Sequence, residues 1–289
     1  MNIRKIGTFL LLALFSLYYP LQGTLWDDIT RCFIPGQRSP NPTIRVLVLH
    51  DVETAYLQVD GKYSLHDPYE NSHLSSRFCG KGRTIQVLSD GLKWGEAFPG
   101  LHQLQICPKH YTTQIILNDQ VYNNPLYIYE IEKGATLSAV VDVPIEDYVG
   151  SLLSTYQNVS LEKEVLAALA IVIRTNAYYE AFHPKTTYWA VDGQVTRYPG
   201  AVSLFPQEEE ALHQTRHMIM SKTSIYEGVA TPFAAQFDAK DRGARNVETA
   251  KISLEEANAM AQGGAHAAQI LAKAFPQATI MLIDQSKNH

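Results

Sequence analysis

Short apolar runs separated by polar turn residues dominate the chain from position 43 to about position 143. Residues 43–52 (TIRVLVLHDV) are rich in β-branched side chains, which is typical of a buried strand. Residues 55–67 (AYLQVDGKYSLHD) alternate apolar and polar positions around Asp60–Gly61, a pair that favours a hairpin turn. Similar runs follow, and we expect this part of the chain to be rich in β-strands.

The spacing of the apolar residues changes to three or four after Pro144, which predicts helices. The apolar face of the first predicted helix consists of Ile145, Tyr148, Leu152 and Leu153. A second, amphipathic helix is predicted over residues 161–182, with Ser160 as its N-cap and acidic residues in its first turn. The Phe-His-Pro sequence should end this helix, because a residue that precedes proline avoids the helical conformation.

The C-terminal third mixes both kinds of pattern. A Glu-rich helix is expected near residues 206–217, a strand-like run covers residues 232–237, and a last helical segment starts near residue 253 and is broken by two glycines. The complete pattern predicts an α+β fold with a β-rich N-terminal part, a helical core segment and a mixed α/β C-terminal part.

The first 23 residues have the plan of a secretory signal peptide. A basic start precedes an apolar run from Phe9 to Leu17, and small residues follow near Gly23. We therefore divide the chain into a signal peptide (1–23), a linker (24–43) and one domain (44–289). Cleavage would release the chain, and an uncleaved segment would anchor it to a membrane. In both cases the working part is exported and faces the periplasm or the cell wall.

Composition narrows the class of partner. The formal net charge of −5 argues against a nucleic-acid-binding protein, which would carry a concentrated basic surface. The 16 tyrosines suit either β-strands or surfaces that bind sugars. Export permits a disulfide, and among the three cysteines the pair Cys79–Cys107 is preferred to the pairs with Cys32, although all three can equally stay unpaired.

Familiar catalytic and cofactor motifs are not found in the sequence. It has no phosphate-binding loop, no dinucleotide fingerprint and no Gly-x-Ser-x-Gly. His213 and His217 have the spacing of two ligands on one helix but no suitable Glu nearby, so a solvated helix face is the preferred interpretation. We expect neither a metal nor another cofactor.

Several pieces of the chain, in the right order, resemble the SpoIID/LytB family of exported peptidoglycan proteins (stage II sporulation protein D and the amidase enhancer LytB). The stretch from Tyr148 to Glu180 resembles the family's central segment, and "GQVTRYPG" resembles its Gln-Val-Tyr-x-Gly motif. "ALHQTRH" resembles an Ala-x-x-x-Thr-x-Gly segment that leads into a strand. The positions that match the central segment are Tyr148, Glu164, Arg174, Thr175 and Ala177.

This resemblance implies that the protein acts on peptidoglycan during cell-wall remodelling, division or a process like sporulation. Sporulation members are lytic transglycosylases, which need a carboxylic acid to protonate the glycosidic oxygen. Tyr156 stands where the family has its catalytic Glu, and a tyrosine is a poor proton donor to a leaving oxygen. Glu248 and Glu255 are candidate replacement acids, and surface glutamates are the alternative interpretation.

The resemblance also implies residues that contact the glycan. These candidates are Arg174, Tyr148, Gln194 and Tyr198. For Arg174, a structural role that ties its helix to Glu164 or to a carbonyl is equally expected. The family's Cys and His near the Gln-Val-Tyr motif hold a metal in some members, but residues 190–193 (AVDG) stand in that region.

Two functional hypotheses follow. The chain is either a divergent lytic transglycosylase or a non-catalytic module that binds peptidoglycan or enhances an amidase. The partners are peptidoglycan glycan strands and, in the second case, a cell-wall amidase. No nucleic acid is expected, and contact with a membrane would occur only through an uncleaved signal segment.

Overall fold

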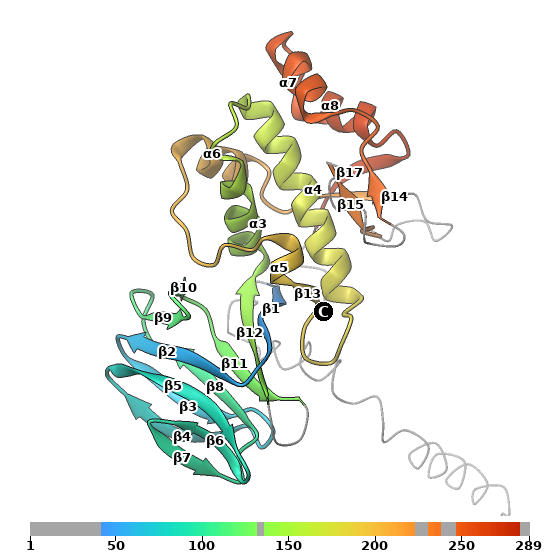
Figure 1. Ribbon diagram of the computed structural model, residues 1–289. Coiled ribbons are helices and arrows are strands. Elements are labelled where there is room, and N and C mark those ends of the chain that lie inside the picture. The colour runs from blue at the N-terminus through green and yellow to red at the C-terminus, as the bar shows by residue number, and fades with distance from the viewer. Residues whose placement is uncertain (1–41, 132–135, 223–230, 238–246, 284–289) are drawn as a thin grey trace, which may run out of the picture. The chain divides into compact units, whose positions relative to one another are not determined.

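The computed structural model describes residues 42–131, 136–222, 231–237 and 247–283 (Figure 1). The predicted signal peptide, residues 24–41 of the predicted linker and Cys32 lie outside these described residues. The described part of the chain has most of its strands before residue 145 and all of its helices after residue 144, so the predicted α+β class is confirmed.

Two sheets form most of the first hundred described residues. The strands of the seven-stranded sheet, in spatial order, are β13 (Val191–Asp192), β1 (Thr43–Val52), β12 (Leu137–Pro144), β11 (Leu126–Glu130), β8 (Gln103–Pro108), β3 (Tyr63–Asp67) and β4 (Ser72–Arg77). The strands of the six-stranded sheet are β10 (Gln120–Tyr122), β9 (Gln114–Leu117), β2 (Thr54–Asp60), β5 (Gly80–Leu88), β6 (Gly91–Trp94) and β7 (Glu96–Pro99). The neighbouring strands within both sheets are antiparallel, except that β1 and β13 are parallel.

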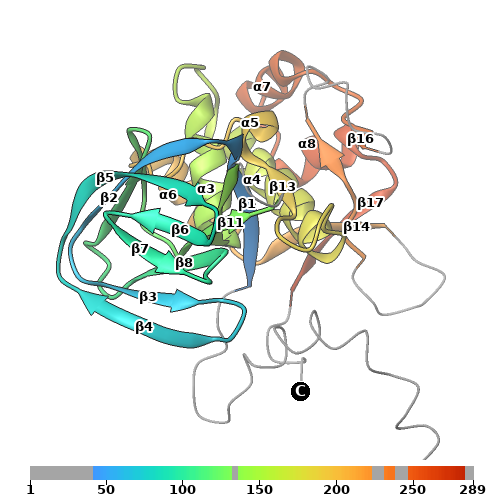
Figure 2. The same cartoon turned by 60° about the horizontal axis from the view of Figure 1, so that its bottom comes forward.

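The two sheets face each other across a shared apolar core (Figure 2). Tyr63 of β3 and Trp94 of β6 contact each other between the sheets, with ring centroids 6.0 Å apart. The indole Nε1 of Trp94 also donates a hydrogen bond to the carbonyl of Leu57 in β2 (3.0 Å). This buried bond satisfies the one polar atom of the indole, as burial of tryptophan requires.

The predicted hairpin over residues 55–67 is wrong in its pairing, although both strands exist. β2 pairs with β5 and β9, whereas β3 pairs with β4 and β8 in the other sheet. Gly61 adopts a φ of +115°, and an added Cβ would lie 2.7 Å from the Thr113 hydroxyl. The Asp-Gly pair therefore turns the chain from one sheet to the other.

The predicted Cys79–Cys107 disulfide is absent, and both thiols are free. Cys107 lies in β8, whereas exposed Cys79 lies between β4 and β5. Strand β3 lies between β8 and β4, so these two strands are separated by two strand spacings of about 4.8 Å each. This separation is larger than the Cα distance of about 7 Å that a disulfide tolerates.

Strand β12 continues directly into the helical part of the fold (Figure 1). The helices are α3 (Ile145–Leu153), the 3-10 helix η2 (Ser154–Tyr156), α4 (Lys163–Phe182), α5 (Gly193–Thr196), α6 (Pro206–Gln214), α7 (Leu254–Gln262) and α8 (Ala267–Ala274). The remaining strands are β14 (Met218–Lys222), β15 (Ala235–Gln236), β16 (Glu248–Thr249) and β17 (Ala278–Leu282). The strand predicted over residues 232–237 is thus reduced to the two residues of β15.

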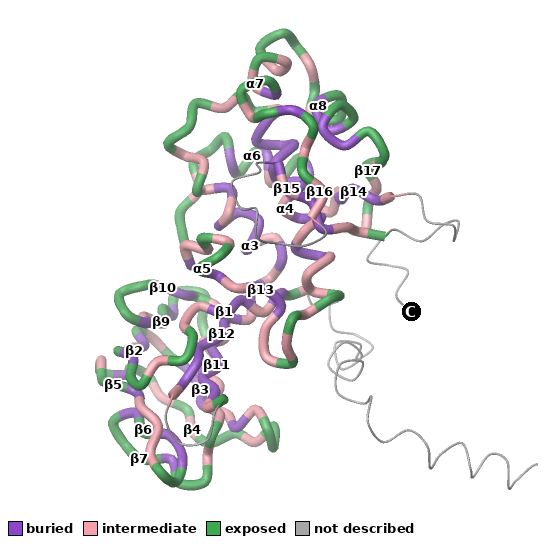
Figure 3. Tube along the Cα trace, turned by 45° about the vertical axis from the view of Figure 1, so that its right-hand side comes forward, coloured by how far each residue is buried: buried purple, intermediate pink, exposed green. Residues whose placement is uncertain are grey.

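Helix α4 is the centre of this part and contacts α3, α6, α7, α8 and β14. Apolar residues cover most of its circumference, and Figure 3 shows it as largely buried. By length and composition α4 could cross a membrane, with a mean hydropathy of 1.2, but 67% of that window is buried inside the fold. Its apolar character is therefore explained by its central position in the core.

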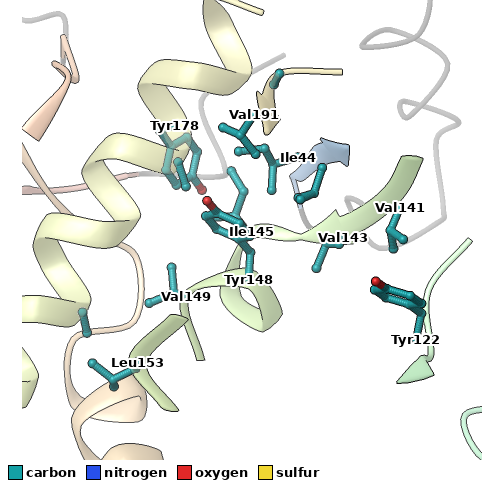
Figure 4. Close-up of a cluster of buried hydrophobic side chains, with 14 of the residues drawn as sticks. Ile44, Tyr122, Val141, Val143, Ile145, Tyr148, Val149, Leu153, Tyr178 and Val191 are labelled. Carbon is teal, nitrogen blue, oxygen red and sulfur yellow. The ribbon is translucent and has the colours of Figure 1, made fainter. Parts of the chain in front are cut away.

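The junction between α3 and the sheet is a second packed region. Ile145 and Tyr148 of α3 gather with Ile44 of β1, Val143 of β12 and Val191 of β13 (Figure 4). All five side chains are buried. This packing sets the direction in which α3 leaves the sheet and so positions the segment that follows it.

The start of α4 differs from the predicted one. Glu162, not Ser160, is the N-cap residue, and its side chain makes no capping hydrogen bond. The side chain of Asn258 in α7 holds this end instead, because its Oδ1 accepts from the Glu162 N–H (2.7 Å) and its Nδ2 donates to the Ser160 carbonyl (3.3 Å). The predicted end at Phe182 is confirmed.

Candidate functional site

A groove of about 470 Å³ opens at the turn between α3 and α4, around Tyr156. We call it the first groove, and its lining consists of Tyr156, Gln157, Asn158, Val159, Ser160, Leu161, Glu162, Leu166, Phe205, Gln207 and Glu208. Tyr156 ends the 3-10 helix η2 and is half-buried, and its carbonyl accepts a hydrogen bond from the Val159 N–H (2.9 Å). The break between the two helices is therefore a concave surface.

Two carboxylates line the first groove. Glu208 is only 3% exposed, and its Oε2 accepts hydrogen bonds from the Phe205 N–H (2.9 Å) and from Nε2 of Gln157 (2.8 Å). The first of these bonds closes the N-terminus of α6, where a glutamate at the third position is a common cap. Glu162 is exposed at the start of α4. Glu208 was not among the residues predicted from the sequence, although a glutamate three residues after Phe205 fits a capping pattern.

A second groove of about 350 Å³ lies beside α5. Its lining consists of Val48, Leu49, Leu117, Asn118, Gln120, Tyr122, Gly193, Gln194, Arg197 and Tyr198. The predicted glycan-contacting residues Gln194 and Tyr198 are thus brought together, with the β9–β10 turn opposite them. The buried ring of Tyr148 stacks against Tyr198, with centroids 5.6 Å apart, and so supports the groove from behind.

Tyrosine hydroxyls of the second groove stay protonated over the physiological range. Burial raises the pKa of Tyr122 to about 12. Burial also raises the pKa of Tyr198, and the neighbouring tyrosines Tyr122 and Tyr148 and the carboxylate of Asp147 act in the same direction. These phenols can therefore donate hydrogen bonds, but they do not supply negative charge.

Arg174 is completely buried and does not face either groove. Its Nε and Nη2 donate to the two carboxylate oxygens of Glu146 in α3 (both 2.8 Å). Its Nη1 donates to the carbonyls of Thr215 (2.9 Å) and Met218 (3.2 Å). Of the two predicted roles, the geometry matches the structural one, with Glu146 in the place expected for Glu164. Tyr148, at 1% exposure, likewise packs behind the second groove and does not line it.

Residues 133–221 match the family model described as SpoIID, Stage II sporulation protein. This segment is a SpoIID domain. It contains all the residues that line the first groove. Of the second groove it contains only Gly193, Gln194, Arg197 and Tyr198, and the other lining residues come from β1, β9, β10 and the turn between β9 and β10. Its family connects the protein with a peptidoglycan-related function.

Two chlamydial proteins are similar to the chain over most of its length. A protein of Chlamydia muridarum is 29% identical over 246 residues, which cover 84% of this chain and 78% of that protein. A protein of Chlamydia pneumoniae is 27% identical over 278 residues, which cover 94% of each. Neither name states a function, and no solved structure matches the chain significantly.

The two candidate replacement acids lie outside the SpoIID domain and outside the first groove. Glu248 belongs to the short strand β16 and forms an ion pair with Lys222 of β14. Glu255 is exposed in the first turn of α7. The structure therefore does not bring either carboxylate to Tyr156.

Carboxyl groups with a raised pKa lie elsewhere in the SpoIID domain. Desolvation, followed by the negative charge of Glu146, raises the pKa of Asp147 in α3. Desolvation also raises the pKa of Glu180 in α4. Neither residue lines the first or the second groove.

The histidine pair of the SpoIID domain does not lie on one helix. Helix α6 ends at Gln214, and His217 has a left-handed φ of 64° at the position where the family pattern has glycine. Within the described part of the chain, there is no group of three or more His, Cys, Asp or Glu side chains that could hold a metal ion.

Proposed function

We propose that this protein binds peptidoglycan glycan strands outside the cytoplasm without cleaving them, with the first groove as its main binding surface. The observation that carries this proposal is Tyr156, which lies in the groove at the position expected for the family's catalytic Glu. A phenol offers an apolar face and a hydrogen-bond donor to a sugar, but it is too weak an acid to protonate a leaving glycosidic oxygen.

The state of the groove carboxylates supports binding over cleavage. Glu208 uses Oε2 to accept two hydrogen bonds, one of which caps α6, and Glu162 is exposed to solvent at the start of α4. A general acid for a glycoside needs an environment that keeps its proton near neutral pH. The Oε2 of Glu208 is instead held by two donors of the fold itself.

The arrangement of the two grooves supports an extended ligand. Tyr148, behind the second groove, is near the start of α3, and Tyr156 follows its end, eight residues later. At a rise of about 1.5 Å per residue these positions are roughly 12 Å apart along the helix. We propose that a polymer long enough to span this distance contacts both grooves.

Retention on insoluble peptidoglycan tests the binding function. We expect wild-type protein to sediment with the polymer and Tyr156→Ala to bind about tenfold more weakly, the effect of losing about 1.4 kcal/mol from one aromatic contact. The control is Tyr69→Ala, which removes a ring that is 84% exposed and lies outside both grooves. Failure of the wild type to sediment would refute the proposal.

A specific observation favours cleavage as a second candidate function. Glu208 is nearly buried in the wall of the first groove, which is where the acid of a lytic transglycosylase would have to lie. In that reaction the acid protonates the glycosidic oxygen, and its carboxylate then takes the proton from the sugar's own 6-hydroxyl. That oxygen attacks the anomeric carbon and closes a 1,6-anhydro ring, while the bond from this carbon to the protonated glycosidic oxygen breaks and the rest of the strand leaves as an alcohol.

Mass spectrometry of peptide-free glycan after incubation with the protein separates the two candidates. Binding alone predicts no anhydro-ended products from the wild type, and a gain of such products with Tyr156→Glu, which restores the acid. Cleavage by Glu208 predicts products that disappear with Glu208→Gln. Glutamine also serves as a cap at this helix position, so the second variant should keep its fold.

An amidase that acts on the same polymer is the expected protein partner of the non-catalytic form. We propose that bound protein changes the rate at which a purified cell-wall amidase releases peptides from peptidoglycan. The comparison with Tyr156→Ala shows whether such an effect depends on the first groove. An unchanged amidase rate at saturating protein would remove this part of the proposal.

A further inference from the structure

Arg197 enters the second groove from an unusual backbone conformation. It follows α5 with φ 55° and ψ 40°, which is the left-handed region. Its N–H donates to the Gln194 carbonyl (3.3 Å), and the next residue, Tyr198, donates to the Gly193 carbonyl (2.8 Å). Glycine is the usual residue in this conformation, because a side chain is strained there, so an arginine at this position points to a role for its side chain.

The charge of Arg197 is not neutralised within the described part of the chain. Its side chain is exposed, and no described carboxylate lies within ion-pair distance of it. Asp192 at the start of α5 is occupied, because its Oδ1 accepts from the backbone N–H groups of Gln194 (2.9 Å) and Val195 (3.4 Å). Asp119 lies in the β9–β10 turn but is not part of the groove lining.

The other groups of the second groove complement a sugar. Tyr198 contributes a half-buried aromatic ring and Tyr122 a buried one, and the exposed amide of Gln194 contributes a donor and an acceptor. The other amides are engaged, since Asn118 accepts from the Tyr56 N–H (2.8 Å) and Gln120 donates to the Pro199 carbonyl. Arg197 thus adds a carboxylate-binding guanidinium beside a surface for a sugar ring.

We propose that the second groove binds a carboxylate-bearing unit of peptidoglycan through Arg197, an inference that rests on the proposed glycan-binding function. A peptide-free strand carries the free lactyl carboxylate of its muramic acid residues. A strand with stem peptides uses that carboxylate in an amide bond but presents the carboxylates of the peptide. Strands of N-acetylglucosamine alone carry neither, so Arg197 distinguishes peptidoglycan from neutral amino-sugar polymers.

Three soluble ligands test the inference with the full chain. They are peptide-free peptidoglycan strands, strands that keep their stem peptides, and neutral N-acetylglucosamine oligomers. We expect Arg197→Asn to bind the carboxylated ligands about fivefold more weakly, as for the loss of an exposed ion pair of about 1 kcal/mol, and to bind the neutral oligomers unchanged. A loss confined to the peptide-free strands assigns the lactyl carboxylate, and a loss confined to the others assigns the stem peptide.

Matched variants make the result specific. Asparagine tolerates the left-handed conformation, and Arg197→Gly relieves it, so both variants should keep the fold and lose the same affinity. Arg83→Gln removes an equal charge from an exposed position of β5 outside both grooves and should leave binding unchanged. Equal affinity of wild type and both Arg197 variants for the carboxylated ligands would overturn the inference while leaving glycan binding intact. Absence of wild-type binding to all three ligands would overturn both proposals.

Discussion

The buried pair of Arg174 and Glu146 provides the sharpest test of how this fold is held together. The guanidinium is completely buried, and the Glu146 side chain is 18% exposed. Two parallel hydrogen bonds of 2.8 Å join them, and the two carbonyls that Arg174 also binds, those of Thr215 and Met218, lie at the two ends of the turn between α6 and β14. One side chain therefore connects α3, α4 and that turn.

Replacing Glu146 with alanine leaves the Arg174 charge buried with only the two carbonyls as partners. Each hydrogen bond to a charged group contributes about 1.5–3 kcal/mol, and loss of one partner from a buried ion pair typically costs about 3–5 kcal/mol. We expect Glu146→Ala to lower the free energy of unfolding by about that amount. The measurement is urea unfolding, in which the midpoint should fall while the slope stays constant.

An exposed ion pair of the same chain is the matched control. Lys273 and Glu256 are 53% and 48% exposed, so Glu256→Ala should cost less than about 1 kcal/mol. A loss below about 1 kcal/mol for Glu146→Ala as well would refute the reasoning, because it would mean that the Arg174 charge is not effectively buried. A double variant, Glu146→Gln with Arg174→Met, should recover part of the loss, because it removes the unpaired charge.

Three further predictions concern the framework. Asn258→Ala should lower the free energy of unfolding by about 1 kcal/mol, whereas Ser160→Ala should change it by less than about 0.5 kcal/mol, both measured by urea unfolding. The unfolded chain releases the Tyr122 proton near pH 10 and the folded chain near pH 12, so Tyr122 alone should lower the free energy of unfolding by up to about 1.4 kcal/mol per pH unit through this range. The slope measured for Tyr122→Phe should be smaller than that of the wild type by this amount. Gly200→Ala should lower the melting temperature, because φ is +80° and the added Cβ would lie 2.6 Å from the Val121 carbonyl; an unchanged melting temperature would contradict this steric argument.

Local periodicity was sufficient to predict most of the elements. The strand over residues 43–52, the helix after Pro144 and the end of α4 at Phe182 all follow from patterns that lie within one or two turns of the chain. The family resemblance was also confirmed, because its motifs are local runs of residues. The position that this resemblance singles out, Tyr156, lies in the first groove.

Pairing between distant segments was not predictable in the same way. Two alternating strands around an Asp-Gly pair suggest a hairpin, yet β2 and β3 find other partners, because the choice depends on strands up to sixty residues away. The same reason explains the start of α4, where Asn258 replaces the expected local cap. It also explains why the expected Cys79–Cys107 disulfide does not form, because β3 lies between the strands next to which these cysteines lie.

Some residues of the candidate site were likewise predictable from local sequence, and others were not. The residue types at Tyr156, Gln194 and Tyr198 could be read from the chain, because a motif is a short range of sequence. Glu208 and Arg197 became candidates only when the fold placed one in the wall of the first groove and the other, with no described ionic partner, in the second. Burial and concavity arise when elements distant in sequence pack together. The sequence therefore determined which residue types are present in each motif, and the tertiary structure decided which side chains can face a ligand.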